Sequence, residues 1–285
     1  MYGTIVAGTD LSDTARIATD RAAALAKSLG AKFVLVHAGA SSEDLAVLGK
    51  DYGAEVVAEA GDPASVLISE VDRIDADLLV VGSVGMRGAR RLLLGSVPNK
   101  VSHHAPTDLL IVKTDPPPRR FDTYSSVLVG TDGSPTATLA VKKVSSLAAR
   151  MGMRLVIVCA FEPLSEQEMK QLRGDPEDPV EQWNAPKVAQ GTPSEFRWRI
   201  ADAVQAQDIL DRASEVASEA GVEADARAIE GNPAETLLSV AENDGLDLIA
   251  VGSVGMTGAK RFMLGNVPNR ISHHAPTDVL ILHTS

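Results

Sequence analysis

Short apolar runs alternate with amphipathic stretches along this chain. Five runs in its first part predict buried strands, at 3–9, 32–38, 54–59, 77–82 and 108–113. Between them, apolar residues at helical spacing predict a helix over 13–29, another helix is expected over 96–104, and Pro63 marks the first turn of a third. Strands that alternate with helices in this way indicate a parallel sheet with helices on both faces.

The same pattern occurs twice. Residues 4–10 match residues 126–132 at an offset of 122 positions, whereas residues 82–108 match residues 252–278 at an offset of 170. The difference between the two offsets gives the second copy about 48 additional residues. A duplication followed by one insertion or deletion explains this arrangement.

The repeat predicts two domains. We expect the first over 1–115, a stiff Pro-rich linker over 116–124 and the second over 125–285. Each domain is expected to hold an open, parallel, five-stranded sheet with helices on both faces, which is a Rossmann-like α/β fold.

The additional residues of the second copy form an expected insertion at about 162–210. It is acidic, contains prolines and carries both tryptophans, Trp183 and Trp198. Because it leaves the carboxyl end of a parallel strand, we hypothesise that it covers part of a ligand site or forms an oligomer contact. A solvated loop is the alternative. A helix is expected to resume over 205–220, where apolar residues recur on one face.

Composition narrows the functional classes. A formal net charge of −11 over 285 residues argues against a nucleic-acid partner, which needs a basic surface. The only cysteine, Cys159, lies in an apolar run, which indicates a reducing compartment and a buried thiol rather than a nucleophile. Without a basic leader or an apolar run of membrane-spanning length, we expect a cytoplasmic protein that binds no membrane.

Glycines at fixed offsets point to an anion site. In the first copy, Gly82 ends a strand, Gly85 follows, and Gly95 comes directly before an expected helix. Glycine lets the chain turn without a Cβ clash and lets a ligand approach the main chain. The free N–H groups of Ser96 and Val97 at the helix start suit a phosphate. The spacing differs from both a Walker A loop and a GxGxxG fingerprint.

A single glycine motif of this kind would favour tight turns without a ligand, so its recurrence matters. The glycine pattern, a following Val and a later Ala-Pro-Thr-Asp sequence occur at 82–108 and again at 252–278. Together they resemble the universal stress protein family in its tandem two-domain form. The resemblance covers almost the whole chain except the insertion, and it implies the adenine nucleotide alpha hydrolase-like variety of the Rossmann-like fold.

In the nucleotide-binding branch of this family, the pattern holds ATP. The resemblance therefore implies an adenine nucleotide in each domain, either alone or with Mg²⁺. Asp10 and Asp132 would contact the base or ribose side or help to hold a metal, and Ala38 and Ala160 would line the adenine pocket. The ribose and phosphates would contact Gly82, Gly85, Gly95, Ser96 and Val97 in the first copy and Gly252, Gly255, Gly265, Asn266 and Val267 in the second.

The two expected sites are not identical. Ser96 is replaced by Asn266, whose amide can donate and cap a helix but is larger and has no hydroxyl to offer magnesium. We therefore expect two related sites of unequal affinity. The expected mechanism is binding, with occupancy setting conformation or partner affinity. A slow ATPase and a scaffold that has lost its ligand are the alternatives, and no residue stands out as catalytic.

The histidine pairs 103–104 and 273–274 look like metal ligands at first sight. Adjacent residues on a helix point about 100° apart, so they converge poorly on one ion. Both pairs end a helix, and we expect them to bond terminal carbonyls instead.

Four further polar residues receive structural interpretations. Ser12 and Ser134 are expected to cap helices, and Asp108 and Asp278 to shape the turn into the last strand of each copy. The family resemblance also implies that the last strands of the two copies pair with each other. It further implies that the chain forms a homodimer and has an unidentified protein partner.

Overall fold

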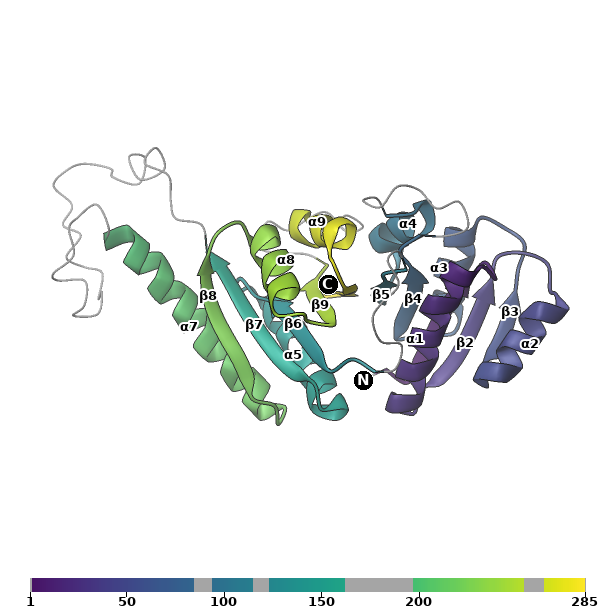
Figure 1. The fold of residues 1–285 in the computed structure, drawn as a ribbon, viewed down its shortest axis with the longest axis horizontal. Helices are drawn as coiled ribbons and strands as arrows, with labels where there is room; N and C mark the ends of the chain where they lie inside the picture. Colours follow the sequence, from purple (N-terminus) through teal and green to yellow (C-terminus); the bar gives the residue numbers. More distant parts are fainter. Residues whose placement is uncertain (1, 85–93, 115–122, 162–196, 254–263, 285) are drawn as a thin grey trace.

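The computed structural model describes residues 2–84, 94–114, 123–161, 197–253 and 264–284. Within these residues the chain forms one ten-stranded sheet with helices on both faces (Figure 1). The strand order is β3-β2-β1-β4-β5-β10-β9-β6-β7-β8, so each copy of the repeat supplies five neighbouring strands. The predicted α/β fold is therefore confirmed.

The first half alternates strands and helices. Its strands are β1 (Thr4–Thr9), β2 (Lys32–His37), β3 (Glu55–Ala58), β4 (Leu78–Gly82) and β5 (Asp108–Val112). Its helices are α1 (Asp13–Leu29), α2 (Glu43–Tyr52), α3 (Pro63–Arg73) and α4 (Ser96–His104). Every strand and helix expected here is present. Helix α2 is an addition that the apolar pattern misses, because only Leu45 and Gly49 on it are buried.

The second half repeats this order. Its strands are β6 (Ser126–Gly130), β7 (Arg154–Phe161), β8 (Ala224–Glu230), β9 (Leu248–Gly252) and β10 (Asp278–Leu282). Its helices are α5 (Pro135–Met151), α7 (Arg197–Glu219), α8 (Pro233–Asn243) and α9 (Asn266–His274). Helix α7 begins before the expected residue 205, inside the segment assigned to the insertion. Residues 162–196, which include Trp183, and residues 115–122 of the linker region lie outside the described residues.

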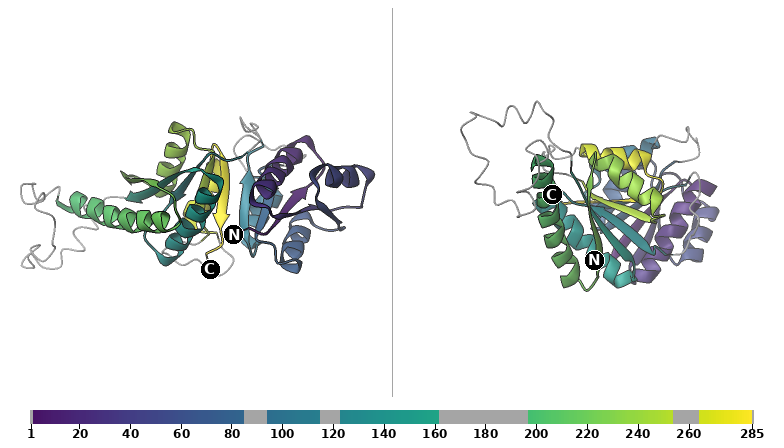
Figure 2. Two further views of the ribbon diagram at one scale, coloured as in Figure 1. Left: turned by 90° about the horizontal axis from the view of Figure 1, so that it is seen from below. Right: turned by 60° about the vertical axis from the view of Figure 1, so that its left-hand side comes forward.

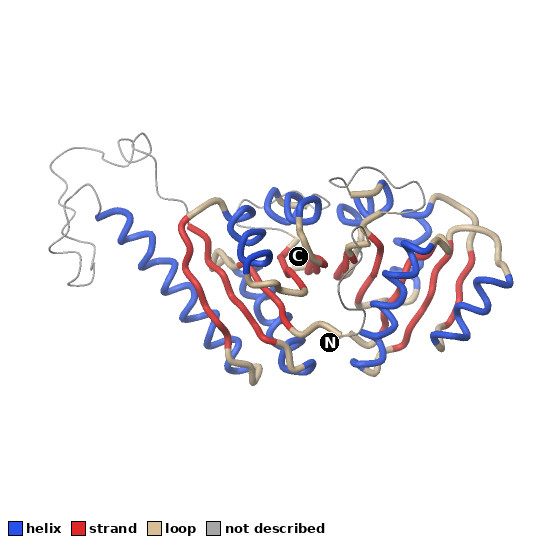
Figure 3. The backbone as a smooth tube through the Cα atoms, in the orientation of Figure 1, coloured by secondary structure: helices blue, strands red, loops and turns tan. Residues whose placement is uncertain are grey.

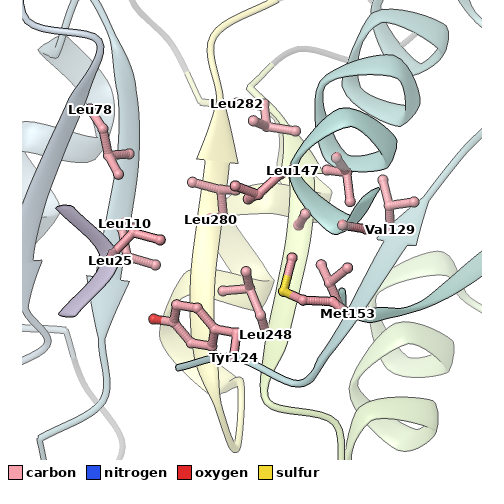
Figure 4. Packing of buried hydrophobic residues seen from close by; sticks show 14 of the residues in the cluster. Leu25, Leu78, Leu110, Tyr124, Val129, Leu147, Met153, Leu248, Leu280 and Leu282 are labelled. Atoms are coloured by element: carbon pink, nitrogen blue, oxygen red, sulfur yellow. The ribbon is translucent and has the colours of Figure 1, made fainter. Parts of the chain in front are cut away.

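Two apolar clusters fill the two faces of the sheet. Helices α1, α2, α5 and α7 cover one face, and α3, α4, α8 and α9 cover the other (Figures 2 and 3). Along β1, Ile5 and Ala7 belong to the first cluster and Val6 to the second, as the alternation of a strand requires. Figure 4 shows part of the first cluster, with Leu110 and Leu280 on the two strands where the halves meet.

The two halves meet where β5 and β10 pair, which we call the junction. The two strands run antiparallel, with Leu110 opposite Leu280. The other strand pairs of the described sheet are parallel. The implied pairing of the last strands is therefore confirmed, and it makes one continuous sheet of the two repeats.

Asp278, the first residue of β10, is buried at the junction and connects the halves. Its carboxylate accepts hydrogen bonds from the backbone N–H of Lys113 at 2.8 Å and from the hydroxyl of Tyr124 at 2.7 Å. Nε of Arg21 on α1 lies 3.3 Å from the same carboxylate, and the guanidinium lies over the Tyr124 ring. Burial raises the pKa of Asp278 above its ordinary value, against the opposing effect of Arg21.

Asp108 has the equivalent place at the start of β5. It accepts hydrogen bonds from the backbone N–H of His283 at 2.7 Å, from Nζ of Lys143 on α5 at 2.8 Å and from the hydroxyl of Tyr2 at 2.9 Å. Each partner occupies the repeat position of one of the partners of Asp278. Both aspartates therefore fasten the two halves together, a role that the expectation of turn-forming residues missed.

We predict that Asp278→Asn lowers the free energy of unfolding by about 3 kcal/mol, because it removes the counter-charge of the buried Arg21 guanidinium. Asp108→Asn should cost roughly half as much, since Lys143 is 37% exposed and also bonds the carbonyl of His283. The exposed Asp72→Asn on α3 is the matched control, with an expected change below about 0.5 kcal/mol. Urea denaturation measures all three, and equal losses for Asp278→Asn and Asp72→Asn would contradict this role.

Candidate functional site

Each half has a topological switch point, between β1 and β4 in the first half and between β6 and β9 in the second. In the first half, α1 follows β1 onto one face of the sheet, whereas α4 follows β4 onto the other. Open α/β sheets bind ligands at the carboxyl ends of the strands at such a point. Asp10 directly follows β1 and Gly82 ends β4, so the structure brings these two predicted residues to neighbouring strand ends.

A tight turn holds Asp10 at the end of β1. The hydroxyl of Thr9 accepts the N–H of Leu11 at 3.1 Å, and Asp10 Oδ1 accepts the N–H of Ser12 at 3.1 Å. The hydroxyl of Ser12 in turn accepts the N–H of Ala15, so Ser12 caps α1 as expected. Leu11 adopts a left-handed backbone with φ of 64°.

The same turn recurs in the second half with one important difference. Asp132 Oδ1 accepts the N–H of Ser134, which caps α5 as expected, and Gly133 has φ of 74°. A Cβ on Gly133 would lie 2.8 Å from a side-chain carbon of Ile209 on α7. Helix α7 therefore packs beside the Asp132 turn and leaves room for glycine alone, whereas the first half accommodates the side chain of Leu11 there.

A backbone hydrogen bond joins the two ends of the glycine motif. In the first half, Ser83 donates its N–H to the carbonyl of Val112, and Gly95 donates its N–H to the carbonyl of Ser83, both at 2.8 Å. A Cβ on Gly95 would lie 3.3 Å from that carbonyl oxygen, and one on Gly82 would lie 3.2 Å from Thr114. These two glycines therefore have packing reasons of their own, apart from any ligand.

The second half closes its motif in the same way. The N–H of Ser253 bonds the carbonyl of Leu282 at 2.8 Å, and the N–H of Gly265 bonds the carbonyl of Ser253 at 3.0 Å. Gly252 ends β9, at the position of Gly82. The middle glycine of each motif, Gly85 or Gly255, lies outside the described residues.

Helices α4 and α9 begin differently from the other helices whose first turns are described. Helices α1, α2, α3, α5 and α8 each begin after a Ser, Asp or Asn side chain that accepts a backbone N–H. By contrast, α4 and α9 begin after Gly95 and Gly265, and among the described residues neither has a side-chain cap bond. Their first N–H groups therefore stay available at the positive end of the helix dipole.

Those N–H groups belong to predicted site residues. In α4 they are on Ser96, which is exposed, and on the half-buried Val97, because Pro98 has no N–H. The next N–H, on Asn99, already bonds the carbonyl of Gly95 at 3.0 Å. In α9 the equivalent donors are on Asn266 and Val267. Two adjacent donors at a helix start, one strand from a carboxylate, can hold an anionic group of a polar ligand.

The two alanine positions differ between the halves. Ala38 lies just beyond the end of β2, whereas Ala160 lies within β7, which continues to Phe161. In the first half, Nδ1 of His37 bonds the carbonyl of Thr9 at 2.9 Å, and the ring lies so close to Gly39 that a Cβ there would be 2.5 Å from Nε2. Cys159 occupies the repeat position of His37, so the second half has no imidazole at the end of this strand, a difference that the sequence analysis did not use.

Two cations near the described starts of α4 and α9 are already paired. Lys100 on α4 contacts Asp62 on α3 at 2.8 Å, and this pairing lowers the pKa of Asp62 to about 2. Arg270 on α9 contacts Glu235 on α8 at 2.6 Å. Any ligand anion would therefore depend on backbone donors more than on these side chains. Among the described residues, no group of three or more His, Cys, Asp or Glu side chains is placed to hold a metal ion.

A groove of about 630 Å³ lies between α1 and α2, far from these residues. Lys32 and Glu55, the first residues of β2 and β3, help to line it, so it opens at the amino ends of the strands. It is therefore separate from the switch point.

The model of the universal stress protein family matches this chain at residues 1–57, 43–113 and 123–283. The chain belongs to the universal stress protein family. Its two halves each carry the family pattern, which makes it a tandem member.

Two curated relatives illustrate how the family matches this chain. A universal stress protein of Mycobacterium tuberculosis is 29% identical over 163 residues, which are 57% of this chain and 98% of the relative. A universal stress protein of Mycobacterium bovis is 28% identical over 232 residues, 81% of this chain and 68% of the relative. The longer match confirms that the resemblance extends across both halves.

Solved structures share the tandem fold. A universal stress protein from Archaeoglobus fulgidus has a TM-score of 0.66 at 18% identity, with complete coverage of both chains. A functionally unknown protein from Pseudomonas aeruginosa has a TM-score of 0.68 at 16% identity and covers 99% of this chain and 93% of its own. These likenesses concern the fold alone.

Two further features of this universal stress protein concern its helices and its only cysteine. Every described helix is too short or too polar to cross a membrane. Cys159 is 3% exposed at the end of β7, and burial, followed by the charge of Asp132, raises its pKa to about 11. The expectation of a buried, structural thiol is therefore confirmed.

We predict that Cys159 does not react with a thiol reagent at pH 8 until the protein unfolds. The raised pKa also means that the folded protein keeps the thiol proton where the unfolded chain loses it. The stability that this provides is complete below the ordinary pKa of 9.0 and is lost as the pH rises through about 11. Cys159→Ala should remove this component. Rapid labelling of the native protein at pH 8 would contradict the prediction.

Proposed function

We propose that this universal stress protein binds an adenine nucleotide, ATP in the first instance, in each half and acts as a nucleotide-dependent stress-response regulator. The observation that supports it most is the pair of helices that start at the switch points without a side-chain cap, next to Asp10 and Asp132. The family pattern at the same residues supports an adenine nucleotide over other anions.

The geometry suggests a division of roles within the first site. The N–H groups of Ser96 and Val97 would bind phosphate oxygens, and the glycine positions would let the ligand lie against the main chain. Asp10 would face the ribose or base, beside Ala38. If Mg²⁺ accompanies the phosphates, the Asp10 carboxylate suits it, because this hard cation prefers oxygen ligands.

We favour binding over hydrolysis. Phosphoryl transfer needs a positioned water and charge stabilisation in addition to a phosphate cradle. In the described part of each site, the carboxylates of Asp10 and Asp132 already accept the N–H groups of Ser12 and Ser134. We therefore do not assign either carboxylate the task of positioning a water. Occupancy would then act by favouring one conformation of the chain or one partner complex. We place this function in the cytoplasm, which the free Cys159 fits, and expect the chain to act as a homodimer.

We predict that Gly95→Asp and Gly265→Asp each abolish one of two ATP sites. Aspartate is a good N-cap, so it should keep the helix while occupying its N–H groups and repelling phosphate. A Cβ on Gly265 would meet nothing closer than 3.5 Å, so this substitution fits without strain, whereas one on Gly95 would lie 3.3 Å from the carbonyl oxygen of Ser83, which must shift by a few tenths of an ångström. The control is Asn243→Asp, at an exposed position at the end of α8. It adds the same charge near the amino ends of the strands, away from the candidate sites.

Isothermal titration with ATP measures the outcome. Two sites in the unsubstituted chain, one in each variant and two in the control would support the proposal. Full ATP binding by the double variant would contradict it, as would the absence of ATP binding by the unsubstituted chain together with no nucleotide in the denatured, purified protein.

We further predict that Asn266→Ser strengthens ATP binding at the second site. Serine restores the hydroxyl and the smaller side chain found at position 96, and one added hydrogen bond to a charged group is worth about 1.5 kcal/mol, roughly tenfold in affinity. The measurement uses the Gly95→Asp background, in which only the second site remains. Unchanged or weaker binding would show that residue 266 does not set the inequality of the sites.

A further inference from the structure

Helix α4 extends from one site to the edge of the other. Its first residue, Ser96, belongs to the site of the first half. In its last turn, Nδ1 of His103 accepts the backbone N–H of Leu264 at 3.4 Å, across the boundary between the halves. Leu264 is buried and directly precedes Gly265, where the second half begins α9. Figure 1 shows α4 and α9 facing each other above the junction.

This hydrogen bond defines the state of the histidine. A backbone N–H can bond Nδ1 only if that nitrogen carries no proton, so the proton of the neutral ring lies on Nε2. The next N–H along the chain, on Gly265, bonds the carbonyl of Ser253 at 3.0 Å. Consecutive N–H groups of the second glycine motif are thus fixed by opposite halves of the protein.

We infer that His103 is a positioning residue for the nucleotide site of the second half. It touches no ligand itself. It holds the backbone at Leu264, and through it the start of α9, whose Asn266 and Val267 N–H groups are the expected phosphate donors. The inference rests on the proposed function, and it makes the second site incomplete without a side chain of the first half.

The surroundings of His103 make this role depend on pH. Among the described residues, His104 on the same helix acts on His103, and His273 on α9 faces it. His273 is itself acted on by His274 on α9, by Lys113 after β5 and by His103. Burial, and then His104, lowers the pKa of His103. At neutral pH the ring is therefore neutral and can accept. Protonation in more acidic solution turns Nδ1 into a donor and breaks the bond to Leu264.

The test uses the full chain with Gly95→Asp, so that ATP titrates the second site alone. At about pH 8, His103→Leu should weaken ATP binding about three- to tenfold, the effect of one lost hydrogen bond. His103→Asn should stay within about twofold, because the amide oxygen of asparagine can take the place of Nδ1. His104→Asn, on the exposed neighbouring residue, is the matched control and should leave the affinity unchanged at this pH.

Two further readouts separate positioning from a general loss of structure. Dividing the ATP dissociation constant of the chain that keeps His103 by that of the His103→Asn chain cancels the titration of the phosphates. This ratio should rise as the pH falls from about 8 to about 5.5, because only histidine loses its acceptor by protonation in that range. Without ligand, the amide of Leu264 should exchange its hydrogen faster in His103→Leu but not in His103→Asn.

Two results would overturn the inference, and they can be told apart. Equal ATP affinities for the chain that keeps His103 and for His103→Leu would overturn this inference alone. No ATP binding by the unsubstituted chain would overturn the proposed function and this inference with it.

Discussion

The buried carboxylates of Asp108 and Asp278 hold the two halves together, and the relative placement of the two candidate sites depends on them. Each begins one strand of the antiparallel junction, accepts a hydrogen bond from a backbone N–H of the opposite half and forms an ion pair with a cationic side chain of that half. Buried carboxylates are costly unless they are fully bonded, so the halves cannot separate or shift without leaving charges unpaired. The junction thereby also sets the contact between α4 and α9.

Within this shared frame, the two repeats have diverged around their switch points. The backbone turn after the first strand is the same in both halves. The first half has Leu11 there, whereas the second has Gly133, because Ile209 on α7 occupies the space that a side chain would need. His37 ends its strand, whereas the strand with Cys159 continues to Phe161. The strands, the caps and most of the expected ligand-contacting residues are therefore kept. The differences lie at and beside them, where Leu11, His37 and Ser96 correspond to Gly133, Cys159 and Asn266. This is the pattern expected if the two sites have separate roles.

Local patterns predicted most of the fold. Apolar runs predicted the strands. Ser12 and Ser134 marked the starts of helices, because a serine hydroxyl can accept an N–H group of the first helical turn. Helix α2 was not predicted, because it buries too few apolar side chains to give the sequence a helical apolar pattern. The contacts of Asp108 with Lys143 and His283 could not be predicted, since residues so far apart leave no local signal.

The candidate site was predictable in part. Asp10, Gly82, Gly95, Ser96 and Val97 lie together at the switch point, but the packing around Gly82 and Gly95 is reason enough for glycine there, so a glycine pattern alone does not indicate a ligand. The missing side-chain cap of α4 and α9 is the stronger signal, and it is readable in the sequence as a Gly before each helix. The contact of His103 with the opposite half needed the three-dimensional structure.

Native mass spectrometry of the purified chain with ATP tests the central claim most directly, because it counts bound molecules without assuming equal affinities. The account predicts successive masses for one and then two nucleotides per chain, with the second appearing at higher ATP concentration. A chain that stays free of nucleotide at millimolar ATP would contradict it.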